Sequence, residues 1–425
     1  MEYKELFSIA HKKGITNIQI AETTNHITQT EVINKELETY ENSYTTTYNI
    51  KAEYNSKTVK LVSDYLDEDI LDQIILKATY TDSIYEDEYL TDTSNNNKID
   101  EKYIENENNI LTKLYNLDKY RNDEIYKLIT YYTDNYEKKR IINNNNVDIS
   151  TSSHYYEFYT ETIVKKGEDY SSFNNTWLTV SEKDLTLDKY VLDTIEKAKK
   201  ISSKNSIQTG KHNIIIDSTV LTTILSTFTT MISGENIRKK FSCLENSLGK
   251  KIFSDKLTII EEPTNKKYPG YTLFDNEGTP TKDKIVVADG KLNTYLYNIK
   301  EAKYVKQNST GNGFNSISTR NMYIKPGNKS LEELFSTLNN GIYITELMGA
   351  DNTSINANTG NISIQIFGFI IENGKIKSGF KPCILTTNIF ELFSNIQEIG
   401  SDLRFTTIAV GCPSVLIKDI SIVGN

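Results

Sequence analysis

The chain has 425 residues, of which 37% are hydrophobic and 25% charged, a balance typical of a globular protein too long for one ordinary core. Its net charge of -9 argues against a nucleic-acid binder, because phosphate neutralisation needs clustered Lys and Arg. The most apolar stretch, residues 362–371, is about half as long as a membrane helix, and residues 1–5 lack the character of a signal peptide. We therefore expect a cytoplasmic protein that binds neither nucleic acid nor membranes.

Residues 1–92 are predicted to form an N-terminal α+β domain. Residues 2–13 suit a helix that ends near Gly14, and residues 17–64 alternate like an antiparallel meander with one face in water. Residues 67–77 then have the 3.6-residue period of a helix that packs on this sheet. Polarity rises sharply around residues 93–109, and a domain boundary is predicted there.

A central α+β domain is predicted for residues 93–210. Its first half has a helical pattern over residues 111–136, followed by a turn at the Asn tract 143–146. Three strands and an amphipathic helix come next, and the polar stretch 202–210 is read as a linker. The strands are expected at residues 148–153, 155–165 and 169–180, and the helix at residues 187–201.

Residues 211–425 are denser in β signals and are predicted to form a curved antiparallel sheet or partial barrel with packed helices. A buried strand at 214–217 leads into a helix at 218–233, which Asp217 or Ser218 can cap. Asp289-Gly290 and Asn373-Gly374 each indicate a hairpin turn. Further elements are a capping box at residues 330–333 with a helix through 338, a helix at 385–399 and a last strand at 414–423. The predicted fold class is thus α+β, with an N-terminal antiparallel sheet and a C-terminal curved one.

Residue chemistry alone indicates no active site. The histidines have no HExxH or HxH spacing, and the cysteines form no CxxC pair. These residues are His11, His26, His154, His212, Cys243, Cys383 and Cys412. The stretch STGNGFNS at 309–316 lacks the spacing of a phosphate-binding loop, and no GxSxG elbow is present. Cys412 has no cationic neighbour in sequence, so we interpret it as a buried, inert thiol.

The C-terminal half resembles the TldD/PmbA family of gyrase modulators and metallopeptidases. Nine sequence blocks carry the resemblance, in the family's order, over residues 211–425. They include SGEN at 233–236, FDNEGTPT at 274–281, STGNG at 309–313 and GCPSVLI at 411–417. SGEN and FDNEGTPT are the most specific of them. The N-terminal half resembles the family more loosely, through HKKGITNIQI at 11–20.

The family has two kinds of member, and the helix at 218–233 indicates which kind this chain is. In the TldD kind, two His of an HExxxH helix and a downstream Cys in a Cys-Gly-Lys context hold zinc, while the Glu activates water. By the family's spacing from SGEN, these helix positions are Leu225, Ser226 and Thr230, none of which is a good zinc ligand. The Cys-Gly-Lys segment is missing too, and the ligand role does not pass to Cys412. The resemblance implies the PmbA (TldE) kind, with no catalytic residue, metal or cofactor of its own.

The implied function is that of a non-catalytic subunit. It would pair with a zinc-bearing TldD-kind subunit, and the complex would cleave unfolded peptides, including the precursor of a gyrase-poisoning microcin. The alternatives are a stand-alone metallopeptidase with an unrecognised site and a non-proteolytic binding protein of the gyrase-modulator type. Alone, the chain is expected to form a homodimer.

The same resemblance suggests residues for a peptide channel or its framework. They are Ser233, Gly234, Glu235, Asn236, Asp275, Glu277 and Gly278. On the helix, an apolar stripe indicates core packing, whereas the opposite row either lines a cleft or meets water. That row consists of Thr219, Thr222, Thr223, Ser226 and Thr230.

Overall fold

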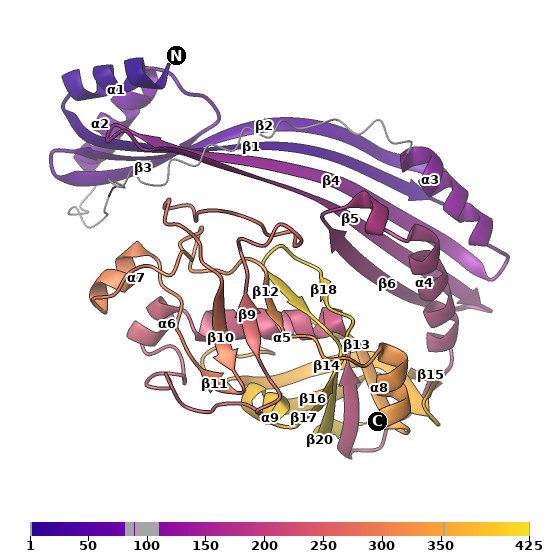
Figure 1. Cartoon of the computed structure of the whole chain (residues 1–425). Helices are drawn as coiled ribbons and strands as arrows, with labels where there is room; N and C mark the ends of the chain where they lie inside the picture. The colour runs from indigo at the N-terminus through magenta and orange to yellow at the C-terminus, as the bar shows by residue number, and fades with distance from the viewer. Residues whose placement is uncertain (1, 81–88, 90–109, 352, 425) are drawn as a thin grey trace.

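The computed structural model describes residues 2–80, 89, 110–351 and 353–424. A long antiparallel sheet, called sheet A here, arches over a C-terminal part built around a small barrel (Figure 1). Helices α1 (Tyr3–Lys12) and α2 (Asp69–Tyr80) lie at one end of the arch, and α3 (Ile110–Leu117) and α4 (Leu187–Ile201) lie at the other. The predicted α+β class, with an N-terminal antiparallel sheet and a C-terminal curved one, is confirmed.

Sheet A contains strands from both halves of the chain before residue 180, in the order β3-β2-β1-β4-β5-β6. Four of its strands are 19 residues long. The strands are β1 (Ile15–Ile33), β2 (Glu36–Tyr54), β3 (Lys57–Ser63), β4 (Ile125–Asn143), β5 (Asp148–Lys166) and β6 (Asp169–Thr179). The accompanying helices are α1 (Tyr3–Lys12), α2 (Asp69–Tyr80), α3 (Ile110–Leu117) and α4 (Leu187–Ile201). Strands from the first two predicted domains thus share one sheet, and the domain limits stay predictions.

The helix predicted for residues 111–136 is wrong over most of its length. Only α3 and a short 3-10 helix at Asp118–Tyr120 are helical, and β4 begins at Ile125 and pairs with both β1 and β5. A central strand that packs on both faces loses the clean alternation of an exposed strand, so its apolar residues also fit a helical period. The two strands predicted at 148–153 and 155–165 are one continuous strand, β5.

The C-terminal part is organised around a five-stranded barrel. The ladder β13-β8-β20-β16-β14 closes because β14 also pairs with β13. The barrel strands are β8 (Gly210–Ile216), β13 (Gly341–Met348), β14 (Asn361–Glu372), β16 (Cys383–Asn388) and β20 (Val415–Val423). The extensions of this sheet are β7 (Lys204–Asn205), β15 (Lys375–Phe380) and β17 (Ile396–Ile399).

A second sheet, in the order β11-β10-β9-β12-β19-β18, covers the side of the barrel that faces sheet A. Its strands are β9 (Ile259–Glu261), β10 (Lys284–Ala288), β11 (Lys291–Leu292), β12 (Met322–Ile324), β18 (Arg404–Phe405) and β19 (Val410–Cys412). The helices of this part are α5 (Ser218–Met231), α6 (Gly234–Arg238), α7 (Ile299–Tyr304), α8 (Leu331–Leu338) and α9 (Ile389–Ser394).

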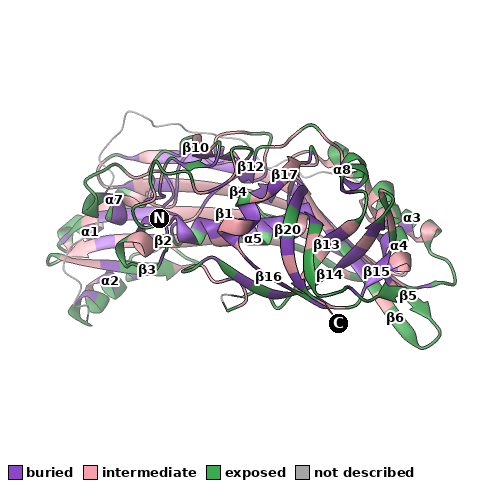
Figure 2. Cartoon of the chain, turned by 90° about the horizontal axis from the view of Figure 1, so that it is seen from below, coloured by how far each residue is buried: buried purple, intermediate pink, exposed green. Residues whose placement is uncertain are grey.

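Helix α5 is the centre of the C-terminal core. It packs against β13 and β19, and its buried side chains join one apolar cluster with the inward residues of the barrel and of the second sheet. Figure 2 shows α5 largely buried between these layers. Asp217 caps the helix through a hydrogen bond from the Thr219 N–H, as predicted.

The helix predicted for residues 385–399 is also wrong. Residues 383–388 are β16, only Ile389–Ser394 are helical, and residues 396–399 are β17. Both strands pair with β20, and the short α9 makes the corner between them. β16 has six residues and β17 four, and each is too short for its own period to stand out from that of the helical turn between them.

Several local predictions are confirmed. The predicted helix at 187–201 is α4, and the hairpin turns at Asp289-Gly290 and Asn373-Gly374 connect β10 to β11 and β14 to β15. The capping box of Ser330 and Glu333 opens α8. In the described ranges, no helix is both long and apolar enough to cross a membrane.

Candidate functional site

The positions on α5 that the resemblance assigns to the family's zinc site have other roles in the structure. Leu225 is fully buried in the apolar core. The Ser226 hydroxyl donates to the Thr222 carbonyl at 2.8 Å, and Thr230 is exposed to solvent. In the polar row, Thr222 is buried and donates to the Ser218 carbonyl, whereas Thr223 meets water. The helix therefore presents no group of side chains that could hold a metal.

Cys412 lies on β19 against α5, where it is fully buried. Burial raises the pKa of its thiol far above the ordinary value, although a contact with Thr222 works in the opposite direction. A thiolate, which is the form that binds zinc, is therefore strongly disfavoured there. Leu225, Ser226, Thr230 and Cys412 together do not fit a zinc ion.

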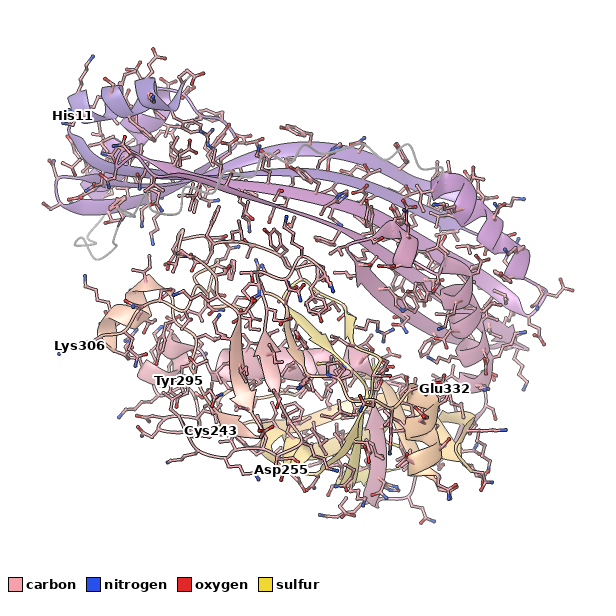
Figure 3. All side chains as sticks on the ribbon, viewed as in Figure 1. His11, Cys243, Asp255, Tyr295, Lys306 and Glu332 are labelled. Atoms are coloured by element: carbon pink, nitrogen blue, oxygen red, sulfur yellow. The ribbon has the colours of Figure 1, made fainter. Side chains whose placement is uncertain are left out.

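The histidines lie on separate elements. His11 is on α1, which Figure 3 shows at the end of sheet A remote from the C-terminal barrel, and His212 is on β8. His154 of β5 is hydrogen-bonded to Asp134 at 2.6 Å, and His26 of β1 to Asn42 at 2.7 Å. Among the described residues, no three His, Cys, Asp or Glu side chains are grouped so as to hold a metal.

The SGEN block ends α5 and begins α6. The Asn236 amide donates to the Thr230 carbonyl at 2.8 Å, which satisfies a carbonyl at the end of α5. The Gly234 N–H donates to the Leu296 carbonyl at 2.8 Å, and Ser233 forms a parallel bridge with the same residue. A Cβ on Gly234 would lie 2.3 Å from the ring of Tyr297, so only glycine fits.

Glu235, the remaining residue of this block, points to solvent. It forms an ion pair with Lys239 at 2.6 Å, one turn further along the chain, and both side chains are exposed. This contact lowers the pKa of the Glu235 carboxyl. Glu235 is therefore a surface residue rather than part of an enclosed site.

The FDNEGTPT block is a tight turn organised by the buried carboxylate of Asp275. One oxygen accepts the N–H groups of Glu277 and Thr279 at 3.0 and 2.9 Å, and the other accepts the N–H of Gly313 at 2.8 Å. The Gly278 N–H closes the turn on the Asp275 carbonyl. Burial raises the pKa of Asp275 to about 7, with Glu277 adding to the rise and the three backbone N–H groups opposing it.

Glu277 connects this turn to α7. Its carboxylate accepts the N–H of Ile299 at 2.8 Å. It also lies so close to Gly313 that a Cβ there would be 2.4 Å from a carboxylate oxygen. The turn at 275–278 and the STGNG loop at 309–313 therefore pack so closely that a larger residue at Gly313 would displace the Glu277 side chain.

The two predicted blocks are joined through residues 296–299 and 309–313. Leu296 contacts the SGEN block, and the Tyr297 N–H donates to the Thr310 hydroxyl at 2.7 Å. Residues 309–313 then contact Asp275 and Glu277. The structure thus brings Asp275, Glu277 and Gly278 together directly and links Ser233, Gly234 and Asn236 to them through the intervening segments.

A cavity of about 410 Å³ lies between sheet A and these loops, and we call it the arch cavity. Its roof is formed by β1, β2, β3 and β4, and its floor by residues 274–277, 298–300 and 314–316. The charged side chains that line it are Glu22, Lys51, Lys60, Lys139, Arg140, Asp275, Glu277 and Lys300. This size is in the range of pockets that hold small ligands or a few residues of a peptide. Asp275 and Glu277 line the cavity, whereas the SGEN residues do not.

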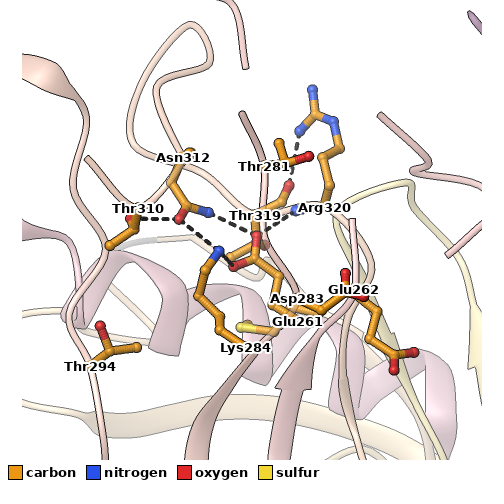
Figure 4. A network of polar contacts seen from close by, with 12 residues as sticks. Glu261, Glu262, Thr281, Asp283, Lys284, Thr294, Thr310, Asn312, Thr319 and Arg320 are labelled. Atoms are coloured by element: carbon orange, nitrogen blue, oxygen red, sulfur yellow. Dashed lines mark hydrogen bonds and ion pairs between the residues drawn. The ribbon is translucent and has the colours of Figure 1, made fainter. Parts of the chain in front are cut away.

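The floor of the arch cavity is held by a buried polar network that the sequence did not indicate (Figure 4). Glu261 is 1% exposed and accepts hydrogen bonds from Lys284 at 2.7 Å, Asn312 at 2.8 Å and the Arg320 N–H at 3.0 Å. A buried carboxylate needs such partners to be stable. The only signal in the sequence was an acidic pair after an apolar strand, at residues 261–262, too general to identify a network.

A second network that the sequence did not indicate joins sheet A to the start of α5. The Arg404 guanidinium donates to the Asn175 side chain of β6 and to Asp217, both at 2.8 Å. Asp217 is fully buried and also accepts the hydroxyl of Tyr343. Burial alone would raise the pKa of Asp217, but Arg404 and Lys197 outweigh it and lower the pKa. Arg404 therefore fastens the two layers together beside the N-terminus of α5.

Comparisons with known proteins agree with the sequence blocks. A family profile described as the PmbA/TldA metallopeptidase C-terminal domain matches residues 209–424. The chain is 31% identical to the metalloprotease PmbA of Escherichia coli O157:H7 over 223 residues, which are 52% of this chain and 48% of that protein. It is 35% identical to a PmbA homologue of Buchnera aphidicola over 232 residues, which are 55% of this chain and 50% of that protein. The chain thus spans about half the length of the curated relatives it matches.

Two solved structures resemble the whole described chain. A candidate modulator of a DNA gyrase from Thermotoga maritima superposes with a TM-score of 0.88 at 25% identity, covering 99% of this chain and 98% of that one. TldE of Thermococcus kodakarensis has a TM-score of 0.86 at 19% identity, covering 99% of both chains, which shows a common fold. With the match over residues 209–424, these findings establish that the chain belongs to the PmbA/TldD family.

Proposed function

We propose that this chain is a PmbA-like subunit that is not catalytic alone and that works with a zinc-bearing TldD-kind subunit on unfolded peptides. The main support is the composition of α5, where Leu225 is committed to the apolar core and Ser226 to a carbonyl of its own helix. Neither residue can bind zinc or activate water. Any metal would then belong to the partner, and this chain has no cofactor of its own.

The contribution of this chain to the complex would be one wall of a peptide channel. The arch cavity supports this role because one side is a sheet and the other is a set of loops fixed by Asp275, Glu277 and Glu261. An extended peptide can add as a strand to a sheet edge with little demand on its sequence, and β3, the edge strand of sheet A, lines this cavity. In the absence of the partner, the surface that meets the TldD-kind subunit would join two copies of this chain as a two-fold dimer.

The decisive experiment combines metal analysis with reconstitution. The purified chain should contain zinc well below one equivalent and cleave no unfolded peptide. Mixing it with a TldD-kind protein should produce chelator-sensitive peptidase activity. Stoichiometric zinc and activity in the chain alone would instead establish a stand-alone metallopeptidase.

The assembly is tested separately by light scattering at micromolar concentration. A dimer is expected for the chain alone, with an interface of at least roughly 1,000 Å² in total. A monomer that gains no activity on mixing would rule out both the dimer and the partner.

A further inference from the structure

Arg320 is a cation that reaches from the floor of the C-terminal part towards sheet A. Its backbone N–H is bound by Glu261, but its side chain turns away from that network (Figure 4). The guanidinium lies 3.9 Å from the ring centroid of Phe314 and donates one hydrogen bond, to the Thr319 carbonyl at 2.9 Å. Most of the donor capacity of this guanidinium is therefore unused.

Arg320 also lacks a bound counter-charge. No ion pair and no second hydrogen bond of its guanidinium is found within the described ranges. Burial lowers the pKa of Arg320. The charges of Glu137, Glu261 and Tyr155 act in the opposite direction but do not outweigh burial. A half-buried guanidinium in this situation would gain from an anion placed against its free N–H groups.

Tyr155 of β5 lies on the same face of sheet A as Thr151, whose hydroxyl accepts the N–H of Leu273 in the C-terminal part, and Arg320 is near enough to act electrostatically on the Tyr155 hydroxyl. Arg320 lowers the pKa of the Tyr155 hydroxyl, although burial and the acidic neighbours Glu157 and Glu137 raise it overall to about 12. The hydroxyl is thus protonated at neutral pH and can donate a hydrogen bond. It has no hydrogen-bond partner in the part of the chain that the structure describes. Two layers of the molecule therefore direct unused donors at one place.

The region around Arg320 adjoins the arch cavity. The ring of Phe314, over which the Arg320 guanidinium lies, lines the cavity, and so does Lys139 of β4. Tyr155 pairs with Asn135, four residues along β4 from Lys139. Arg320 thus adjoins the cavity, whereas at about 3.3 Å per residue Tyr155 lies roughly 13 Å from Lys139 along the strands. An extended segment of about four residues spans that distance.

We propose that Arg320 and Tyr155 bind a carboxylate of an extended peptide whose adjoining residues occupy the arch cavity. The planar fork of a guanidinium matches the two oxygens of a carboxylate, and the tyrosine hydroxyl supplies a further donor. The inference rests on the proposed peptide binding and adds to it a preference for one chemical group.

The nearby acids do not cancel this preference. Glu137 is paired with Lys139 at 3.1 Å, so its charge is already compensated. Glu157 is two residues further along β5 from Tyr155, and burial raises the pKa of its carboxyl. Glu261 is held by Lys284 and Asn312 on the far side of the Arg320 backbone.

Fluorescence anisotropy with the full chain tests the proposal. Three labelled, unstructured peptides of one sequence serve as probes: a free C-terminal carboxylate without acidic side chains, its amide, and the amide with one internal Glu. The chain should bind at least one carboxylate form roughly tenfold more tightly than the neutral amide, the expected size for a charged hydrogen bond. The two carboxylate forms distinguish a chain end from an acidic side chain.

The variants are Arg320→Gln, Arg320→Lys and Tyr155→Phe. Arg320→Gln should abolish the difference between carboxylate and amide, Arg320→Lys should keep part of it, and Tyr155→Phe should reduce it a few-fold. Arg238→Gln is the matched control, because Arg238 also lies over an aromatic ring, that of Tyr304, but is paired with Glu301. This control should keep the full difference.

Other outcomes overturn the proposal. If Arg320→Gln still discriminates, or weakens all three peptides equally while lowering the melting temperature, Arg320 has a structural role only. If Arg320→Gln does not fold, Arg320→Lys and Tyr155→Phe decide the matter. Binding of no peptide by the unmodified chain would defeat both proposals. Carboxylate preference without activity on mixing with a TldD-kind protein would defeat the subunit proposal alone.

Discussion

Helix α5 and the floor of the arch cavity belong to the same C-terminal part, but their polar groups have different partners. On α5, the hydroxyls of Thr222 and Ser226 bond to carbonyls of the preceding turn. In the cavity floor, the carboxylates of Asp275 and Glu277 bind backbone groups from loops well separated in sequence. Back-bonded hydroxyls add nothing to recognition, whereas fixed loops shape a surface. We conclude that α5 serves as a scaffold, and the proposed binding surface lies at the interface with sheet A.

The largest expected effect concerns the ion pair that holds α5 to sheet A. Arg404→Met should cost about 3–5 kcal/mol of unfolding free energy, because it leaves the buried carboxylate of Asp217 uncompensated. Arg404 helps to lower the pKa of Asp217, so its contribution is complete above the unfolded pKa, about 4, and is lost as pH falls below it. Denaturant unfolding at pH 7 and pH 3.5 should show the difference shrink in acid; a constant difference would contradict the assignment.

The scaffold role of α5 predicts a strong contrast between two positions that the resemblance assigns to the zinc site. Leu225→Ala should cost about 2–5 kcal/mol, because Leu225 is fully buried in the core. Thr230→Ala should stay within about 0.5 kcal/mol, because Thr230 is exposed. Urea unfolding of both variants measures the contrast, and equal effects would mean that α5 is not packed as described.

The close fit of the SGEN block gives a smaller effect. Gly234→Ala should destabilise the chain by about 1–3 kcal/mol, because the added Cβ would lie 2.3 Å from the Tyr297 ring. Gly249→Ala is the contrasting substitution, since its nearest neighbour is a flexible lysine side chain at 3.8 Å and only its positive φ opposes it. A lower melting temperature for Gly249→Ala than for Gly234→Ala would show that backbone strain, not crowding, dominates.

Asp275 should make stability depend on pH in the opposite direction from Asp217. Its folded pKa of about 7 lies above the unfolded value, so the folded state holds the extra proton and stability falls as pH rises between about 4 and 7. Asp275→Asn should remove this slope, while the exposed Asp283→Asn should keep it. Unfolding free energies at pH 5 and pH 7.5 provide the measurement. An unchanged slope in Asp275→Asn would mean that the three backbone N–H groups keep this carboxylate ionised.

The smallest effect is expected at the helix positions themselves. Ser226→Ala and Thr230→Ala should leave the activity of a mixture with a TldD-kind protein unchanged within about twofold, because these hydroxyls form no part of the cavity wall. Peptide cleavage by the reconstituted mixture is the readout. A tenfold loss would return α5 to the functional surface.

Local signals allowed much of the fold to be predicted, and long-range pairing explains the errors. The capping box at Ser330 and the turn at Asn373-Gly374 act within a few residues, so the sequence around them was sufficient. The identity of β4 depends on pairing with β1, more than one hundred residues away, and no local pattern contains that information. The same holds for β16, whose strand character follows from its place in the closed barrel.

The site was predictable only through the resemblance, and only in part. The blocks at 233–236 and 275–278 were named from it, but their connection through Leu296 and Tyr297 depends on the folded chain. Arg404 and its partner Asn175 are 229 residues apart in sequence. Arg320 and Tyr155 are 165 residues apart (320 − 155) and belong to no motif. Single residues that meet across two layers leave no spacing from which to infer them.

The pairing of β1 with β4 also determines the order in which the chain can fold. β1 and β2 meet through a two-residue turn at Asn34-Lys35, both with positive φ, and can form a hairpin as soon as they are synthesised. The other edge of β1 must wait for residues up to Asn143, whose side chain bonds to Gln19 across 124 residues. Closing so long a loop is slow, and the edge of the hairpin stays open to other chains in the meantime. The yield of folded protein should therefore depend on how soon β4 is synthesised after the β1–β2 hairpin. Pausing of the ribosome between residues 55 and 125 should increase aggregation.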